Sequence, residues 1–141
     1  MTRPTYDMHH VVTFEETNLV GNVYYSNYFS WQGRCREMFL HEHAADTLAE
    51  LQNGELRLVT AHASCDFADE FTAFDEVLVR MSLNRFIAYG VSLNFEFCRA
   101  NEKSETLARG RQDIKFLRLK DAQWKLCEMP QVLLKAVRRY E

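Results

Sequence analysis

The sequence predicts an α+β fold, in which one long central helix is wrapped by a curved antiparallel β-sheet. The first observation is a helical pattern of apolar residues over residues 23–43. The second is that, beyond residue 55, apolar residues recur at every second position in several successive segments, which is the period of a strand. Strands that follow one another without intervening helices favour an antiparallel sheet over a doubly wound parallel one. Because 141 residues is the length of one ordinary domain, we expect residues 1–141 to form a single domain.

The N-terminal part predicts one strand and one loop before the long helix. The β-favouring run Met8–Phe14 predicts the first strand. Residues 17–22 contain loop-forming residues, including Gly21. We therefore expect a loop that leads directly into the helix at residue 23.

The long helix has a polar stripe and an apolar face. At about 100° per residue, one stripe holds the side chains expected in solvent, Ser30, Arg34, Glu37 and His41. The far side holds Tyr28, Trp31, Cys35, Met38 and Phe39. Arg36 lies about 130° from the centre of the polar stripe, and its wheel neighbours are Tyr25, Phe29, Gln32 and Leu40. This arginine is therefore expected to point away from solvent, towards an aromatic surface.

The rest of the chain predicts a short helix, the strands and a closing helix. Residues 45–53 form the short helix, with Asp46 as a candidate N-cap and Gly54 as a stop signal. Alternation then predicts strands over residues 59–67, 77–83, 89–97 and 106–119, with turns at residues 101–104 and 121–123, and Pro130 begins the last helix. Open sheet edges are most simply covered by a second copy of the chain, so we expect a homo-oligomer.

Composition narrows the classes of partner. A formal net charge of −3 disfavours a general nucleic-acid binder. The longest charge-free stretch, residues 17–33, contains four Asn or Gln residues and does not resemble a membrane span, and the first residues lack a signal-peptide core. We expect a cytoplasmic protein. The four cysteines, Cys35, Cys65, Cys98 and Cys127, lack metal-site spacing, so we expect reduced thiols and no metal.

Motifs of several nucleophilic enzymes are missing from the sequence. There is no G-x-S-x-G elbow and no glycine-rich phosphate loop. A Cys–His pair stays open, although nothing local points to one. The unusual residues are concentrated in residues 14–28, a loop that runs into the start of the long helix. Free N–H groups and the positive end of the helix dipole gather there, which suits an anion or a developing oxyanion.

Residues 13–28, Thr-Phe-Glu-Glu-Thr-Asn-Leu-Val-Gly-Asn-Val-Tyr-Tyr-Ser-Asn-Tyr, followed by Arg34-Cys-Arg-Glu-Met-Phe-Leu, carry a resemblance to a known family. They resemble the hot-dog thioesterases of the 4-hydroxybenzoyl-CoA thioesterase type, and the strand order after the helix agrees. The loop aspartate of that family falls at position 18, where this chain has Asn18. With this asparagine, the N-terminal half is most similar to the thioesterases of enediyne polyketide biosynthesis.

The resemblance implies a function and a set of site residues. The expected reaction is hydrolysis of a linear polyene β-ketoacyl thioester from the acyl carrier domain of an iterative polyketide synthase, without a cofactor. The released β-keto acid can lose CO₂. The implied assembly is a dimer or a tetramer. The implied catalytic groups are Asn18, Arg36 and the backbone N–H of Tyr25, and we expect Tyr28, Phe29 and Glu16 to contact substrate.

Other roles stay open for several of these residues. Asn18 has no useful pKa and is either a carbonyl- or water-binding group or a turn residue. Arg36 either stabilises an oxyanion or pairs with Glu15 or Glu16, within the chain or across a dimer. Glu16 is an alternative general base, and Tyr28 is a pocket wall or a core residue. The basic residues Lys135, Arg138 and Arg139 either complement a helix dipole or meet an acidic carrier domain.

Two further functions compete with the polyketide reading. One is a general acyl-CoA thioesterase of the same fold, although unactivated thioesters need more help from a base than Asn18 gives. The other is a non-catalytic acyl-binding hot-dog module. Release of free acid from a thioester would distinguish an enzyme from such a module.

Overall fold

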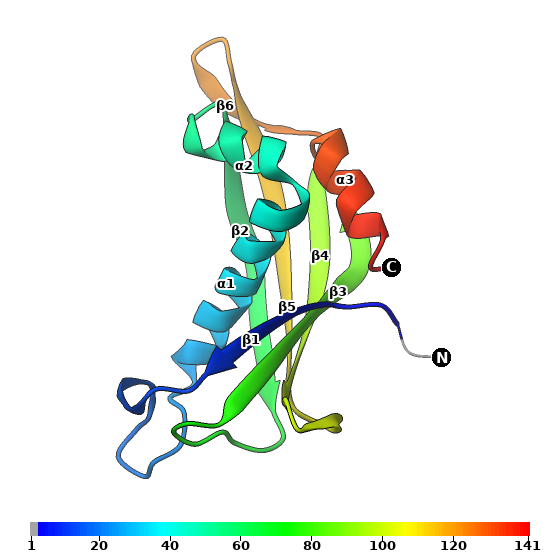
Figure 1. The fold of residues 1–141 in the computed structure, drawn as a ribbon. Helices are drawn as coiled ribbons and strands as arrows, with labels where there is room; N and C mark the ends of the chain where they lie inside the picture. Colours follow the sequence, from blue (N-terminus) through cyan, green and yellow to red (C-terminus); the bar gives the residue numbers. More distant parts are fainter. Residues whose placement is uncertain (1–2) are drawn as a thin grey trace.

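The computed structural model describes residues 3–141, which form six strands and three helices (Figure 1). In chain order the elements are β1 (Tyr6–Val11), α1 (Ser26–His43), α2 (Ala45–Gln52), β2 (Leu56–Phe67), β3 (Glu76–Ile87), β4 (Gly90–Arg99), β5 (Glu102–Lys120), β6 (Gln123–Cys127) and α3 (Gln131–Arg138). A short 3₁₀ turn, Phe14–Glu16, lies between β1 and α1. No helix within the described range is both long and apolar enough to cross a membrane.

One antiparallel sheet holds all six strands. Five of them follow the order β1-β3-β4-β5-β2, and β6 pairs with the distal part of β5. Register shifts interrupt β2 between Thr60 and His62 and β3 between Leu83 and Arg85. Such bulges increase local twist and bend a sheet. The sheet curls around α1, as Figure 1 shows, which confirms the predicted α+β fold with a wrapped central helix.

The core lies between α1 and the concave face of the sheet. From the helix it receives Tyr28, Trp31 and Phe39, which are almost completely buried. The sheet contributes large aromatic side chains, among them Phe95, Phe97 and Phe116. Burying one large apolar side chain stabilises a protein by about 1.5–3 kcal/mol. The face predicted for residues 77–83 is confirmed as part of the inner face of the sheet, and so is the face predicted for residues 89–97 from Val91 onward. Tyr89 was expected to belong to that face, but it lies in the turn before β4 and is exposed.

The long helix begins later than predicted. It starts at Ser26 rather than at residue 23. The N–H of Val23 donates to the Phe71 carbonyl, and that of Tyr24 donates to the Glu16 carbonyl. Asn22 and Val23 also form isolated antiparallel bridges with Thr72 and Thr17, so this segment pairs with neighbouring segments as β-bridges instead of starting the helix.

The predicted solvent stripe of α1 is exposed, and one residue of the predicted inner face is not buried. Ser30, Arg34, Glu37 and His41 all lie on the surface. Met38, which was expected inside, is 41% exposed. It sits next to the exposed Glu37 in the sequence, at the edge of the apolar stripe.

Several smaller predictions were wrong. The first strand ends at Val11, because residues 14–16 turn into the 3₁₀ segment. The N-cap of α2 is Ala44, not Asp46. The turn predicted at residues 121–123 is confirmed for residues 121–122, but Gln123 already begins β6, a strand that was not predicted. The turn predicted at residues 101–104 is wrong beyond residue 101, because β5 begins at Glu102. Asp121 and Ala122 both have positive φ, as in the tight two-residue turns that join the two strands of a hairpin.

The edge strand β2 differs from its predicted pattern. Residues 59–67 were expected to present one apolar face, but Val59, Ala61, Ala63 and Phe67 are exposed. The bulge between Thr60 and His62 breaks the alternation. Because β2 pairs only with β5, its other edge carries free backbone groups.

Candidate active site

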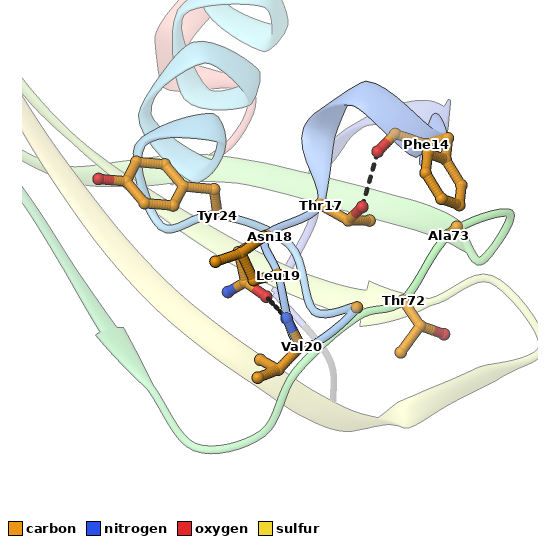
Figure 2. A pocket seen from close by; sticks show the side chains of 9 residues that line it. Phe14, Thr17, Asn18, Leu19, Val20, Tyr24, Thr72 and Ala73 are labelled. Atoms are coloured by element: carbon orange, nitrogen blue, oxygen red, sulfur yellow. Dashed lines mark hydrogen bonds between the residues drawn. The ribbon is translucent and has the colours of Figure 1, made fainter.

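Asn18 closes a tight loop directly before α1. Its side-chain oxygen accepts the N–H of Val20 at 3.0 Å and the N–H of Asn22 at 3.3 Å. Its own N–H donates to the Asn22 carbonyl, and Gly21, with φ of 88°, donates back to the Asn18 carbonyl. The oxygen of Asn18 is thus used by the loop, and its side-chain NH₂ is the part left to bind another group. Figure 2 shows that nitrogen on the side away from Val20.

A large open pocket lies on one side of this loop. It measures about 1000 Å³, and the residues that line it include Phe14, Asn18, Val20 and Tyr24 (Figure 2). Phe14 and Val20 are strongly exposed apolar side chains. The loop therefore presents the Asn18 amide in a largely apolar surface, in which Thr17 and Thr72 are the other polar side chains besides the Tyr24 hydroxyl.

A smaller pocket on the other side of the loop brings three of the predicted site residues together. It measures about 260 Å³ and is lined by Asn18, Tyr25 and Tyr28, with Phe67 and Glu70 opposite. Tyr25 is the N-cap of α1, and its N–H donates to no backbone carbonyl among residues 3–141. Free N–H groups at a helix start suit a carbonyl oxygen that becomes negative.

Tyr28 is a wall of this pocket rather than an acid. Its ring packs against Phe67, Phe71 and Phe97, with ring centroids 4.8–6.2 Å apart. Burial raises the pKa of Tyr28 to about 12, although a hydrogen bond with the Phe71 backbone acts in the opposite direction. A hydroxyl with so high a pKa is a poor proton donor at neutral pH.

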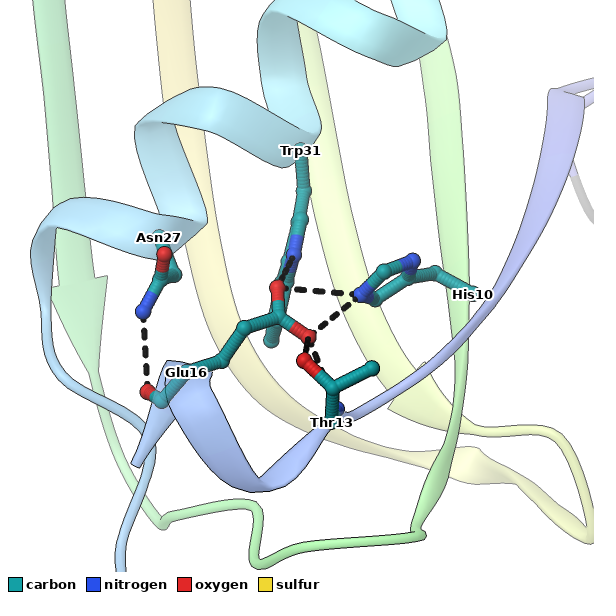
Figure 3. Close-up of polar contacts among 5 residues, drawn as sticks. All are labelled: His10, Thr13, Glu16, Asn27 and Trp31. Atoms are coloured by element: carbon teal, nitrogen blue, oxygen red, sulfur yellow. Dashed lines mark hydrogen bonds and ion pairs between the residues drawn. The ribbon is translucent and has the colours of Figure 1, made fainter. Parts of the chain in front are cut away.

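Glu16 is the centre of a polar cluster that joins β1, the 3₁₀ turn and α1 (Figure 3). Its carboxylate accepts hydrogen bonds from His10 Nε2 at 2.8 Å, from the Thr13 N–H at 2.8 Å and from Trp31 Nε1 at 2.8 Å. Its backbone carbonyl accepts Asn27 Nδ2 at 2.8 Å. The residue Glu16 is 9% exposed, and each of its two carboxylate oxygens accepts a hydrogen bond from the protein.

The same cluster decides the protonation of Glu16. Burial alone would raise the pKa of this carboxyl, but the hydrogen bonds from Thr13, His10 and Trp31 outweigh burial and lower it. A general base works best with a pKa near the working pH, so this environment argues against the base role for Glu16. Its predicted contact with substrate stays a prediction.

Arg36 lies about three helical turns, or roughly 16 Å, beyond Tyr25 on α1. It reaches the sheet, where its Nη1 donates to Gln112 Oε1 at 2.9 Å and lies 3.5 Å from Thr60 Oγ1. No carboxylate among residues 3–141 forms an ion pair with it. The intrachain pairing with Glu15 or Glu16 is therefore wrong, because Glu16 is already bound by His10 and Trp31.

Burial lowers the pKa of the Arg36 guanidinium, and the nearby charge of Glu37 partly offsets it. A guanidinium stays protonated in proteins, so the consequence is a desolvated positive charge without a counter-ion. It lines a cavity of about 580 Å³ between α1, α2 and β2, whose walls are mainly aliphatic, with Leu40, Leu48, Leu51 and Leu58 among them.

Within one chain, the predicted site residues fall into two groups. Asn18, Tyr25 and Tyr28 share one pocket, and Arg36 lines another. Phe29 is partly buried on α1, and its substrate contact stays a prediction. Residues 3–141 hold no group of three or more His, Cys, Asp or Glu side chains close enough to bind a metal ion.

The open possibility of a Cys–His nucleophile finds no support. All four cysteines are free thiols. Burial raises the pKa of the Cys35 thiol, and it raises that of Cys65 to about 12. A nucleophilic cysteine needs a lowered pKa.

Sequence reasoning missed two glutamines that face the helix–sheet layer. Gln112 is 4% exposed and is the acceptor that holds Arg36, and Gln32 is completely buried. A signal for Gln112 was present, since it is the polar member of an inward-facing alternation in β5. The alternation consists of Ala108, Gly110, Gln112, Ile114 and Phe116.

Comparisons with known proteins agree with this geometry. Residues 12–137 match the thioesterase-like superfamily. The dynemicin thioesterase, whose crystal structures reveal induced-fit and allosteric effects upon polyene binding, is 42% identical, covers 97% of both chains and superposes with a TM-score of 0.89. A search of curated protein sequences gave no match.

More distant solved structures share the fold. A 1,4-dihydroxy-2-naphthoyl-CoA thioesterase from Synechocystis is 22% identical over 96% of each chain, with a TM-score of 0.84. A gentisyl-coenzyme A thioesterase is 23% identical over 94% of this chain and 98% of its own, with a TM-score of 0.77. The likeness to an enediyne thioesterase predicted from residues 13–40 is thereby confirmed. The chain belongs to the thioesterase-like superfamily of hot-dog proteins and is a thioester hydrolase.

Proposed function

We propose that the protein hydrolyses a linear polyene β-ketoacyl thioester carried by the acyl carrier domain of an iterative polyketide synthase. The observation that carries this proposal is Arg36, a half-buried cation that forms no ion pair within residues 3–141 and lines the wall of a largely aliphatic cavity. A partly desolvated charge without an ion pair costs stability, and we infer that it serves the negative charge that develops on the thioester oxygen during hydrolysis. The likeness to the dynemicin thioesterase, which binds a polyene, supports the acyl class.

The chemistry needs no strong base if the thioester is activated. A β-keto group withdraws electrons from the thioester carbonyl, so water adds more readily. The carbonyl oxygen becomes an oxyanion, which Arg36, the Tyr25 N–H and the side-chain NH₂ of Asn18 are suited to stabilise. The C–S bond then breaks, the thiol leaves with one proton, and the β-keto acid can afterwards lose CO₂.

The aliphatic cavity suits the chain of such a substrate. Its volume of about 580 Å³ is within the range of small-molecule sites, and the leucine side chains that form half of its lining offer an apolar surface to a polyene. The polar part of the lining consists of Arg36, Glu37, Gln52 and Arg57. Arg36 lies in the same wall, so an acyl chain in this cavity would place its polar end near the guanidinium.

Two protomers are needed if Asn18 and Arg36 act on one carbonyl. Within a chain they line separate pockets, so the proposed site combines Asn18 and Tyr25 of one protomer with Arg36 of its partner. This agrees with the dimer or tetramer expected from the open sheet edges. We also propose that the acyl carrier domain that bears the thioester binds to the protein as its partner.

A comparison of two substrates tests the function. We would follow free thiol release from a β-ketoacyl thioester and from the matching acyl thioester without the keto group, each on coenzyme A and on a carrier domain. We expect preferential cleavage of the β-keto substrate, with a loss of about 10²–10³ in Arg36→Ala and in Asn18→Ala while both variants stay folded. Equal cleavage of the plain acyl-CoA would instead support the general acyl-CoA thioesterase.

A further inference from the structure

Two buried polar atoms on adjacent turns of α1 have no hydrogen-bond partner among residues 3–141. They are the side-chain oxygen of Gln32 and Nε of Arg36. Gln32 is 0% exposed. Native proteins leave few buried polar atoms unpaired, and each such atom calls for a specific explanation. Here one of the two atoms is an acceptor and the other is a donor.

The two side chains enter the same narrow layer between α1 and the sheet. Residues four apart on a helix are neighbours, with about 5–6 Å between their Cβ atoms. Gln32 Nε2 donates to the Ser64 carbonyl at 3.1 Å, and a Cβ on Gly110 would collide with the same nitrogen. Arg36 Nη1 donates to Gln112, two residues beyond Gly110 on the same face of β5.

The contacts on the sheet also fix which atom of each side chain is free. The amide nitrogen of Gln32 is held by Ser64, so its oxygen is the free end. The guanidinium of Arg36 is held at Nη1 by Gln112, so the free donor is the N–H at Nε, next to the aliphatic part of the side chain. Both free atoms are therefore held in place by the sheet.

We propose that Gln32 and Arg36 together bind the water that hydrolyses the thioester. The water would donate to the side-chain oxygen of Gln32 and accept from Nε–H of Arg36, which satisfies both atoms with one small molecule. This inference rests on the proposed function. Of the two residues, Arg36 also lines the aliphatic cavity, so we place the water on the inner side of the guanidinium and the thioester oxygen on its cavity side.

Gln32 cannot remove a proton, so its role is to orient the water. With one water hydrogen directed to Gln32, a lone pair of the water oxygen is free to face the carbonyl carbon. The oxygen forms the new C–O bond, the C–S bond breaks, and one water proton goes to the leaving sulfur. A substrate carbonyl in the same place could only accept, and Gln32 would stay unpaired.

Competition between two nucleophiles tests this role. We would assay the wild type and Gln32→Met with a β-ketoacyl thioester, in the presence and absence of hydroxylamine. Hydroxylamine is a strong nucleophile that attacks the thioester itself and gives a hydroxamate, so its reaction does not need an oriented water. We expect hydrolysis by Gln32→Met to have a kcat about 10–100-fold lower with KM changed less than about threefold. Hydroxamate formation should stay within about threefold, so the hydroxamate-to-acid ratio rises. This ratio does not depend on how much of the variant is folded.

A second variant and a matched control complete the experiment. Gly110→Ala displaces the Gln32 amide from the sheet side and should raise the same ratio. Thr47→Val removes another buried unpaired oxygen, on α2, and should leave the ratio unchanged. An unchanged ratio in both Gln32→Met and Gly110→Ala overturns the water site. A wild type that releases no thiol with either nucleophile overturns the proposed function itself.

Discussion

Asn18 has two separable duties at the scale of a single residue. Its side-chain oxygen holds the loop through Val20 and Asn22, whereas its side-chain NH₂ has no such task. Asparagine is a common turn residue for the first reason. The structure thus confirms the turn role of Asn18. Its role in binding a carbonyl or a water stays a prediction, for which loop closure leaves the amide nitrogen free.

Replacing Asn18 by aspartate separates these duties. Asn18→Asp keeps the oxygen that accepts the Val20 N–H, so the free energy of unfolding should stay within about 0.5 kcal/mol of wild type, whereas Asn18→Ala should lose about 1 kcal/mol. Both variants lose the NH₂ donor, and thiol release should fall by about 10²–10³ in each. Full activity in a folded Asn18→Asp would show that the amide donor is not used.

We expect the Glu16 carboxylate to stabilise the fold rather than to transfer a proton. Glu16→Gln places an NH₂ group against donors from His10, Thr13 and Trp31, and it should lower the free energy of unfolding by about 2–3 kcal/mol at pH 7. The exposed Glu15→Gln is the control and should unfold like the wild type. Thermal unfolding measured by circular dichroism checks both.

The pH dependence of the Glu16 effect has a definite sign. The pKa of Glu16 is lowered in the folded protein, so its carboxylate stabilises the fold above the ordinary glutamate pKa of about 4.3. That stabilisation is lost as the pH falls through the lower, folded value. The difference between wild type and Glu16→Gln should therefore shrink below about pH 4. A difference that grows on acidification would contradict the assignment.

At the scale of an element, α1 holds several of the predicted site residues, and it also contains a glycine that lowers the stability of the helix. Gly33 lies in its interior, and a Cβ added there would meet no atom within 4 Å. Alanine is favoured over glycine in a helix by about 1 kcal/mol, so Gly33→Ala should raise the melting temperature. Gly90→Ala is the contrast, because its Cβ would collide with the Ile114 carbonyl and should destabilise β4. A lower melting temperature for Gly33→Ala would mean that something packs there in an assembly.

Elements with a strong periodic signal were predictable from the sequence, and those set by distant contacts were not. In residues 77–83 and 91–97 every second residue is apolar and lies in the core. The alternation in the sequence therefore predicts both the strands and the face that they bury. The start of α1 depends on the carbonyl of Phe71, far away in the chain, which no local pattern reveals. For Gln112 the sequence held half of the information: the alternation of β5 points its side chain inward, but nothing local reveals that Arg36 is its partner.

At the scale of the whole molecule, the separation of the two pockets is the strongest constraint. Asn18 and Arg36 were predicted to act together, yet in one chain Asn18 lies in the loop before α1, Arg36 lies on α1, and the two line separate pockets. A second protomer resolves this if its Arg36 faces the Asn18 loop of the first. In a dimer with two such shared sites, every site then depends on both chains.

Mixing two inactive variants tests this shared site. Asn18→Ala and Arg36→Ala should each be inactive as pure proteins. After subunit exchange, half of the dimers contain one chain of each kind, and one of their two sites combines an intact Asn18 with an intact Arg36. Thiol release should therefore return to about a quarter of the wild-type rate. Native mass spectrometry confirms that mixed dimers form, and no recovery in their presence would place both residues in one protomer's site.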